Sequence, residues 1–182
     1  FIGNDANPAN NDFNRPPMIT FNLTHQIGVG FGTGSAGMRK KANYAMTDDQ
    51  WYHIAWSFDG TISNLYVNGE LLESSDFAAG LTPIQVPISI IGRKFIGKID
   101  EVRIWDLVRD QEQIQAVMNS SLSGDESGLV AYYPMEVNEN WELIDHSPNE
   151  NHASIVDAEV LQKYSSQNCA SPDGSSLCPF PT

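Results

Sequence analysis

Tight turns between alternating segments constrain the fold of this chain more than any other feature. Residues 51–58 alternate between two faces, with Tyr52, Ile54 and Trp56 on one side, which predicts a strand. The pair Asn68-Gly69 follows a second apolar segment and favours a two-residue type I′ hairpin turn, in which both central residues need a positive φ. Strands joined by such short turns are antiparallel. The centre of the chain is therefore expected to form an antiparallel sheet.

The rest of the chain adds strands, loops and one helix. Apolar or alternating segments predict further strands at residues 18–23, 27–31, 62–67, 70–74, 84–92, 97–105, 128–135 and 151–156. Residues 1–17 and 32–50 are expected to be loops. A short helix is predicted after Asp110, a capping residue with Gln113 three positions on as its capping-box partner. These elements predict an all-β fold, an antiparallel β-sandwich (jelly roll) with one short helix.

The charge balance excludes some partners. The formal net charge is −13, because 23 Asp and Glu residues outnumber 10 Lys and Arg residues. A field of this sign repels phosphate backbones, so no nucleic-acid partner is expected. No run reaches the roughly 20 apolar residues of a membrane-spanning helix, so no membrane insertion is expected. The acidity suits hard cations such as calcium, although it also serves simply to keep a surface protein soluble.

Two features indicate a secreted or cell-surface protein. Cys169 and Cys178 flank a turn-rich loop with no histidine nearby to complete a zinc site, and they are expected to form a short disulfide. Asn22 and Asn119 each begin an N-x-[ST] sequon, the acceptor pattern for N-glycosylation. Both features are typical of chains that pass through a secretory route.

Three separated motifs resemble one family in their order and spacing. They read QWYHIAWSFDG from Gln50, LYVNGELL from Leu65 and IIGRKFIGKIDEVRIWDLVRDQEQI from Ile90. The chain thereby resembles the laminin-G-like and pentraxin-like jelly rolls of the concanavalin A-like lectin/glucanase superfamily. Residues 128–155 are similar to a segment that commonly opens or joins such domains in multidomain bacterial surface proteins.

The resemblance implies a division of the chain. Residues 1–127 are expected to form the laminin-G-like β-sandwich, residues 128–164 its closing or linking strands, and residues 165–182 a loop-like tail that holds the disulfide. The opening strands that are usual in the family do not precede Phe1. The sandwich is therefore expected to be completed by residues 128–156 folding back, by a preceding segment or by a partner chain.

Calcium in a structural role is the one expected cofactor. Asp145, Asn149 and Asn151 belong to a D-x-S-x-N-x-N pattern, whose alternating oxygen ligands suit a hard cation. The same pattern fits an Asx-rich turn in which the side chains bond backbone N–H groups. The resemblance also implies Asp100 as a calcium ligand, with hydrogen bonding to a neighbouring loop as the alternative. The double-calcium loop of pentraxins is not carried over, because only residues 93–96 separate its two flanking motifs.

No catalytic residues are expected. Glycosidases of this fold class carry two Glu and an Asp along one strand, but Lys98 stands where the first Glu belongs and no second Glu follows. Sugar binding needs aromatic faces, for which Tyr132, Tyr133 and Trp141 are the candidates. The remaining tryptophans are expected in the core: Trp51, Trp56 and Trp105.

The predicted function is a non-catalytic extracellular binding or adhesion module of a larger surface protein, which recognises a glycan or a protein. The first alternative is a structural spacer or assembly domain of a filament or multidomain adhesin, with neighbouring domains or chains as its partners. A glycosidase-like enzyme is the third reading.

Overall fold

The computed structural model describes residues 2–3, 16–22, 26–85, 90–92 and 95–155. The chain divides into two compact units. Unit 1 comprises Phe1–Gly97 and Val108–Gln115, and unit 2 comprises Lys98–Leu107 and Ala116–Thr182. The domain boundaries that the sequence predicts, after residues 127 and 164, stay a prediction.

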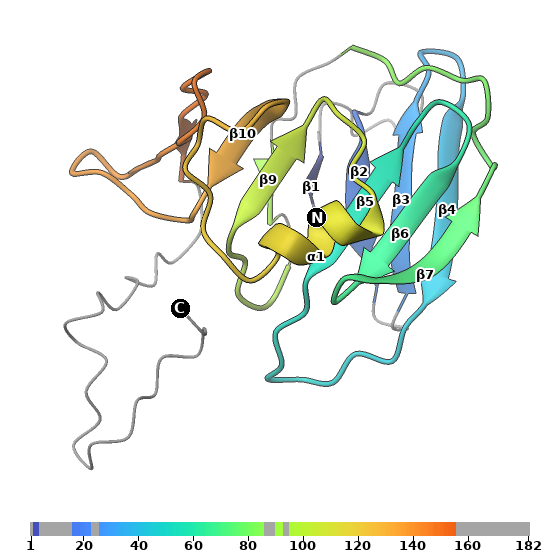
Figure 1. Ribbon diagram of the computed structural model, residues 1–182, viewed down its shortest axis with the longest axis horizontal. Coiled ribbons are helices and arrows are strands. Elements are labelled where there is room, and N and C mark those ends of the chain that lie inside the picture. The colour runs from blue at the N-terminus through green and yellow to red at the C-terminus, as the bar shows by residue number, and fades with distance from the viewer. Residues whose placement is uncertain (1, 4–15, 23–25, 86–89, 93–94, 156–182) are drawn as a thin grey trace. The chain divides into compact units, whose positions relative to one another are not determined.

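Unit 1 contains a five-stranded antiparallel sheet, called here the large sheet, with strand order β4-β3-β2-β1-β8 (Figure 1). Its strands are β1 (Ile2–Gly3), β2 (Met18–Phe21), β3 (Gln26–Gly32), β4 (Gly37–Asn43) and β8 (Ile90–Ile91). Strands β3 and β4 pair over their full length, from Gln26 opposite Asn43 to Gly32 opposite Gly37.

The second sheet of unit 1, called here the small sheet, is an antiparallel meander. It consists of β5 (Ile54–Phe58), β6 (Ser63–Val67) and β7 (Glu70–Ser75). Asn68 and Gly69 join β6 to β7 with φ values of 51° and 77°, so the predicted type I′ turn is confirmed. Between β5 and β6, Asp59 Oδ1 instead accepts the backbone N–H groups of Thr61 and Ile62 and closes a longer loop.

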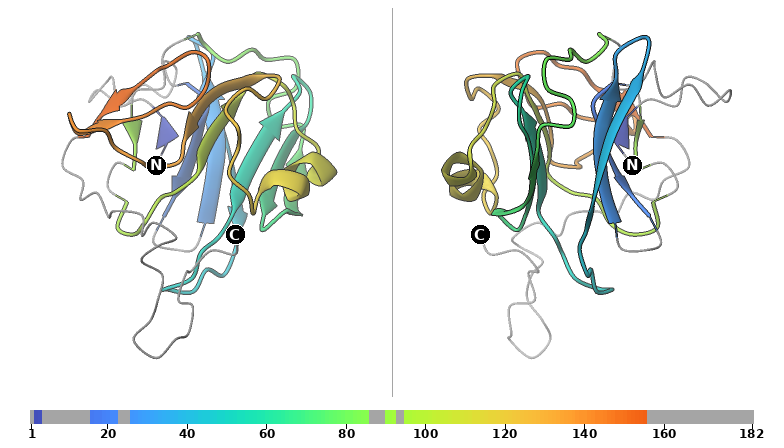
Figure 2. Two further views of the ribbon diagram at one scale, coloured as in Figure 1. Left: turned by 60° about the vertical axis from the view of Figure 1, so that its left-hand side comes forward. Right: turned by 90° about the vertical axis from the view of Figure 1, so that its right-hand side faces the viewer.

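The two sheets of unit 1 pack face to face, as the right-hand view of Figure 2 shows. Their shared core contains Ile27, Val29 and Ala42 from the large sheet and Leu65 and Val67 from the small sheet. Each of the larger buried side chains in this core, from Ile, Val or Leu, stabilises the fold by about 1.5–3 kcal/mol. The predicted antiparallel β-sandwich is therefore confirmed.

The predicted helix is also present, as α1 (Gln111–Val117). The backbone N–H of Gln113 donates to Asp110 Oδ1 at 2.9 Å, and the backbone N–H of Asp110 donates to Gln113 Oε1 at 3.1 Å. This reciprocal pair is a capping box, which satisfies two N–H groups that a helix start leaves unpaired. Ile114 is the buried residue of the helix, and Gln115 donates to the carbonyl of Gly69.

Unit 2 is built around one antiparallel strand pair. Strand β9 (Val102–Trp105) pairs with β10 (Leu129–Tyr133), and a shorter pair joins β11 (Glu142–Leu143) to β12 (Ala153–Ser154). The buried side chains of this unit come mainly from the first pair: Val102, Leu129, Ala131, Tyr132 and Tyr133. The predicted strand at residues 128–135 is thus present, and it pairs with the strand predicted at residues 97–105.

Several expectations were wrong. Residues 1–17 are not all loop, because β1 lies within them and belongs to the large sheet. Residues 32–50 are not one loop, because β4 occupies seven of them and forms an edge of the large sheet. Trp51 is not in the core: it is 43% exposed and precedes the first residue of β5. Trp56 does pack against the core of unit 1, as expected, whereas Trp105 is half-buried and does not belong to the buried core.

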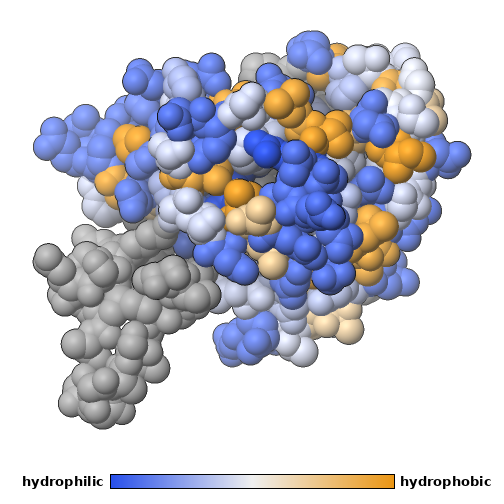
Figure 3. Space-filling view, viewed as in Figure 1, coloured by the Kyte–Doolittle hydropathy of each residue, from blue (hydrophilic) through white to orange (hydrophobic). Residues whose placement is uncertain are grey.

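The surface carries scattered apolar side chains. On the face in Figure 3 they form several small patches separated by hydrophilic residues. Among the described residues, no helix has the length and apolar character needed to cross a membrane.

Candidate functional site

The outer face of the large sheet carries a groove of about 250 Å³. Alternation along β3 explains its floor, because Ile27, Val29 and Phe31 point into the sandwich and leave Gly28, Gly30 and Gly32 facing outward. A Cβ atom on Gly30 would lie 2.0 Å from the carbonyl oxygen of Met38, so no side chain fits there. The backbone of β4 fills the space beside Gly30, and of these three glycines Gly28 is the one that lines the groove.

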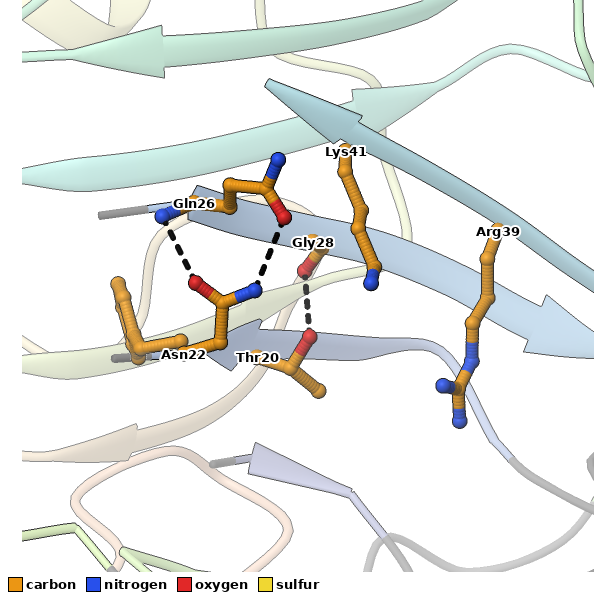
Figure 4. Close-up of a pocket in the computed structure, with 7 residues that line it drawn as sticks. Thr20, Asn22, Gln26, Gly28, Arg39 and Lys41 are labelled. Carbon is orange, nitrogen blue, oxygen red and sulfur yellow. Dashed lines mark hydrogen bonds between the residues drawn. The ribbon is translucent and has the colours of Figure 1, made fainter. Parts of the chain in front are cut away.

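Polar side chains from β2 and β3 form one wall of the groove (Figure 4). Thr20 stands opposite Gly28 and donates its hydroxyl to the Gly28 carbonyl at 3.3 Å. The Asn22 amide donates to Gln26 Oε1 at 2.9 Å, and the Gln26 amide donates to Asn43 Oδ1 at 3.0 Å. These contacts fix the orientation of both amides, so the wall presents hydrogen-bonding groups in set positions.

Two cations from β4 form the other wall. Arg39 stands opposite Gly30 and Lys41 opposite Gly28, and Figure 4 shows both side chains extending over β3 towards the side of Thr20. No hydrogen bond or ion pair joins the Lys41 ammonium to another described residue. Lys40, between them on the strand, lies on the other face and forms a 3.1 Å ion pair with Glu73. The groove thus gathers positive charge on a chain with a net charge of −13.

One aromatic residue also lines the groove, although the register places it opposite Ile27, on the face of the sheet that is turned towards the sandwich. Phe21 lines it and is 37% exposed. Its ring lies 5.8 Å from that of Phe95, measured between centroids, within the range of favourable aromatic pairs. Ligand pockets commonly measure about 300–1,000 Å³. This smaller groove therefore suits one compact group, such as a single ring of a longer molecule.

A match between this chain and a protein-family model shows the family. Residues 5–115 match the family model Laminin_G_3, described as the concanavalin A-like lectin/glucanases superfamily, and this span exceeds half of the chain. The chain belongs to this superfamily. The expectation from the sequence motifs is thereby confirmed, and no curated protein gives a significant match that would narrow the assignment.

Two solved structures are similar to this chain to different degrees. A proposed carbohydrate-binding protein from Bacteroides ovatus matches with a TM-score of 0.61 and 23% identity, over 76% of this chain and 44% of that one. This likeness shows the fold alone, and the chain spans less than half of that protein. An S-layer domain-containing protein from Clostridium thermocellum matches over 56% of this chain and 63% of that one, with 15% identity. Its TM-score of 0.31 is too low to support an argument.

The calcium expected from the D-x-S-x-N-x-N pattern does not fit Asp145 as it lies here. This buried carboxylate accepts N–H bonds from Tyr132, Ser147 and Asn151 and the Ser147 hydroxyl, all at 2.8–2.9 Å. Four donors occupy the four lone-pair sites of a carboxylate. Burial alone raises the pKa of Asp145, but these hydrogen bonds outweigh it and hold the pKa below its ordinary 3.8. The Asx-rich turn, which the sequence pattern also fits, therefore describes the surroundings of Asp145 in this structure.

The other proposed ligands make hydrogen bonds of their own within unit 2. The Asn149 side chain donates to the carbonyl of Val130 at 2.8 Å, and the Asn151 carbonyl accepts the hydroxyl of Tyr133. Asp100 accepts the backbone N–H of Glu101 at 2.9 Å. The described residues contain no cluster of three His, Cys, Asp or Glu side chains that could hold a metal ion. Calcium binding by Asp100 stays a prediction.

The three aromatic candidates for sugar binding have different environments. Tyr132 and Tyr133 are buried, and the Tyr132 hydroxyl donates to Glu101 at 2.8 Å, so neither ring can stack on a sugar as it lies here. Trp141 is 66% exposed. Of the sequon residues, Asn22 lines the groove and Asn119 is exposed after α1. Cys169 and Cys178 lie outside the described residues, so their disulfide stays a prediction.

The residues of the groove were not found from the sequence. Arg39 and Lys41 belong to residues 32–50, for which the sequence predicts a loop, and Thr20 and Gln26 belong to no motif. One signal was available. Glycines at positions 28, 30 and 32 alternate with apolar residues, a pattern that predicts a strand with one bare face.

Proposed function

We propose that this chain is a non-catalytic, extracellular saccharide-binding module, and that the groove on the large sheet receives a sugar ring that carries an acid group. The observation that supports this most directly is the combination of two cations, ordered amides and a hydroxyl over a glycine floor. Membership of a superfamily that includes lectins supports it independently.

Each part of the groove suits one part of such a ligand. Sugar hydroxyls both donate and accept hydrogen bonds, as do Thr20 and the Asn22 and Gln26 amides. The ring itself can lie over Gly28, where no side chain fills the floor of the groove. A carboxylate or sulfate would find Lys41 and Arg39 on the opposite wall, where charge-assisted hydrogen bonds are the stronger ones.

The lining favours binding over hydrolysis. Glycoside hydrolysis commonly uses a pair of Asp or Glu side chains on either side of the scissile bond. The groove is lined by Thr, Phe, Asn, Gln, Gly, Arg and Lys among the described residues, with no carboxylate. In the sequence motif that begins at Ile90, the Glu101 carboxylate is already bonded to Arg103 at 2.9 Å and to Tyr132.

The test is a binding titration with acidic and neutral oligosaccharides: hexamers of galacturonate and chondroitin sulfate beside cellohexaose. An acidic hexamer should bind better at low salt than at high salt, since the cations are exposed to screening. R39Q and K41Q should each weaken this binding about tenfold, the loss expected for one charge-assisted hydrogen bond.

Lys40 supplies the matched control. It lies on the same strand between the two cations, but on the opposite face and paired with Glu73. K40Q removes the same charge and should leave acidic saccharide binding unchanged. Equal losses in K40Q and K41Q would show a general charge effect and would contradict the groove, and the absence of any saccharide binding would favour the spacer alternative.

A further inference from the structure

Trp141 occupies an unusual place in a tight hairpin of unit 2. Residues 139–141 connect Asn138 to Glu142, with the Asn138 N–H donating to the Glu142 carbonyl and the Trp141 N–H to the Asn138 carbonyl, both at 3.1 Å. Trp141 is the last residue of this loop and has a φ of 60°. Three-residue hairpin loops commonly end in such a left-handed residue, for which glycine is the default. A bulky aromatic residue in this conformation is a clear outlier.

The hairpin does not depend on the indole for its shape. Asn138 Oδ1 accepts the backbone N–H groups of Asn140 at 2.9 Å and Glu142 at 3.0 Å, and its amide donates to Glu142 Oε2 at 2.8 Å. The Asn138 side chain therefore holds both ends of the loop. The Trp141 side chain is presented from a backbone that other residues have already fixed.

The indole also contributes little to packing. Trp141 is 66% exposed, compared with 43% for Trp51, and the other two tryptophans are half-buried. No hydrogen bond or ring contact joins its side chain to another described residue. Strain in the backbone and exposure of a large apolar ring both oppose folding. A tryptophan at this place is therefore better explained by a contact with another molecule.

We infer that Trp141 is a stacking platform for a neutral pyranose ring, a second saccharide site that lies in unit 2. The C–H face of a sugar packs on an aromatic ring, and the exposed Glu139 and Asn140 side chains stand beside it for the hydroxyls. Glu139 and Glu142 place negative charge around the ring, which disfavours acidic sugars and anionic lipid surfaces. This inference rests on the proposed function only in that the ligand is a saccharide.

The experiment follows the indole N–H resonance of Trp141 by two-dimensional NMR during titration with cellohexaose, mannohexaose and laminarihexaose. The resonance is identified by its loss in W141G. We expect it to shift saturably with at least one neutral hexamer, and W141G to weaken that binding tenfold or more. The effect should not depend on salt, unlike binding in the groove.

Stability separates this role from a structural one. A tryptophan that packs would cost stability when removed, whereas W141G relieves a left-handed conformation. We expect the Tm of W141G to be unchanged or raised by roughly 2–4 °C, the scale of a small stability gain in a chain of this size. Glu150, with a φ of 49°, is the matched control: E150G should change the Tm in the same sense and leave saccharide binding unchanged.

Three outcomes would overturn the inference, and they can be told apart. A Tm of W141G several degrees below that of the wild type would show that the indole packs. Neutral hexamers that bind without moving the Trp141 resonance, and that R39Q or K41Q weakens, would leave the groove as the saccharide site and remove this one. If no neutral or acidic saccharide binds at all, both this site and the proposed function fail.

Discussion

Asp145 Oδ1 accepts a 2.8 Å hydrogen bond from the backbone N–H of Tyr132, so a loop carboxylate pairs with a strand residue of β10. The same oxygen accepts the N–H of Ser147, and the other carboxylate oxygen accepts the N–H of Asn151. One side chain thereby ties the turn of residues 145–151 to the strand pair that forms the core of unit 2. This tie explains a buried carboxylate without a metal ion.

Replacing Asp145 should cost unit 2 much of its stability. D145N keeps the size of the side chain but exchanges one acceptor oxygen for an NH₂ donor that faces N–H groups. Leaving buried donors unsatisfied costs about 1–3 kcal/mol each, so we expect a loss of roughly 2–4 kcal/mol in the free energy of unfolding. Urea denaturation measures it. Asp48, which is exposed, supplies the control D48N, for which we expect a change within about 0.5 kcal/mol.

The same carboxylate predicts a loss of stability in acid. The pKa of Asp145 is lower in the folded chain than its ordinary 3.8, so the folded state favours the charged form. Its contribution is therefore fully present above about pH 4 and is lost as the pH falls through the lowered folded pKa. Thermal melts between pH 2 and pH 6 should show a steeper acid limb for the wild type than for D145N. Parallel limbs would contradict this assignment.

The same thermal melts test whether calcium binds, and whether it binds at Asp145 or at Asp100. Because the Asp145 oxygens are occupied by the chain's own donors, D145N should lower the Tm equally in millimolar calcium and in a chelator. A ligand that binds only the folded state raises its stability, so a calcium-dependent rise in the wild type would point to Asp100. We expect any such rise to survive D145N and to disappear in D100N. A rise that D145N abolishes would show that the turn rearranges around the cation.

The sandwich could be predicted from the sequence because its signals are local. The turn at Asn68-Gly69, the alternation around Ile54 and the pairing of Asp110 with Gln113 each need only a few neighbouring residues. Strand β4 could not be found in this way. Its inward-facing Lys40 breaks the apolar alternation, and only the three-dimensional structure supplies Glu73 as its partner.

The binding groove was missed for the same reason. Its cations lie on β4, and they come together with Thr20 and Gln26 only through the register of β2, β3 and β4. The sequence shows three aromatic candidates for sugar binding, and only their burial distinguishes them. Tyr132 and Tyr133 are both buried, whereas Trp141 is exposed and lies in a turn. Sequence alone gives the candidates, and tertiary packing decides among them.

The capping box gives a prediction for the helix. D110A removes the acceptor for the Gln113 N–H, and we expect it to cost about 1 kcal/mol, the usual value for losing an N-cap side chain. Q113A removes the reciprocal bond and should cost less. The two losses should be non-additive in a double-mutant cycle, measured by urea denaturation, because the side chains act as a pair. E112A, at an exposed position of the same helix turn, is the control and should change stability by less than either.

Substitutions at two glycines of β3 are expected to distinguish an effect on folding from an effect on saccharide binding. In G30A the new Cβ would lie 2.0 Å from the Met38 carbonyl oxygen, so β4 must move away from β3, and we expect a loss of about 1–3 kcal/mol. In G28A the nearest atom is Thr20 Oγ1 at 2.6 Å, a side-chain atom that can rotate, so stability should change by less than about 1 kcal/mol. The methyl group nevertheless fills the floor between Thr20 and Lys41. We therefore expect G28A to retain its Tm and to bind acidic hexasaccharides more weakly in titration calorimetry. Unchanged affinity in a stable G28A would place the ligand elsewhere on the molecule.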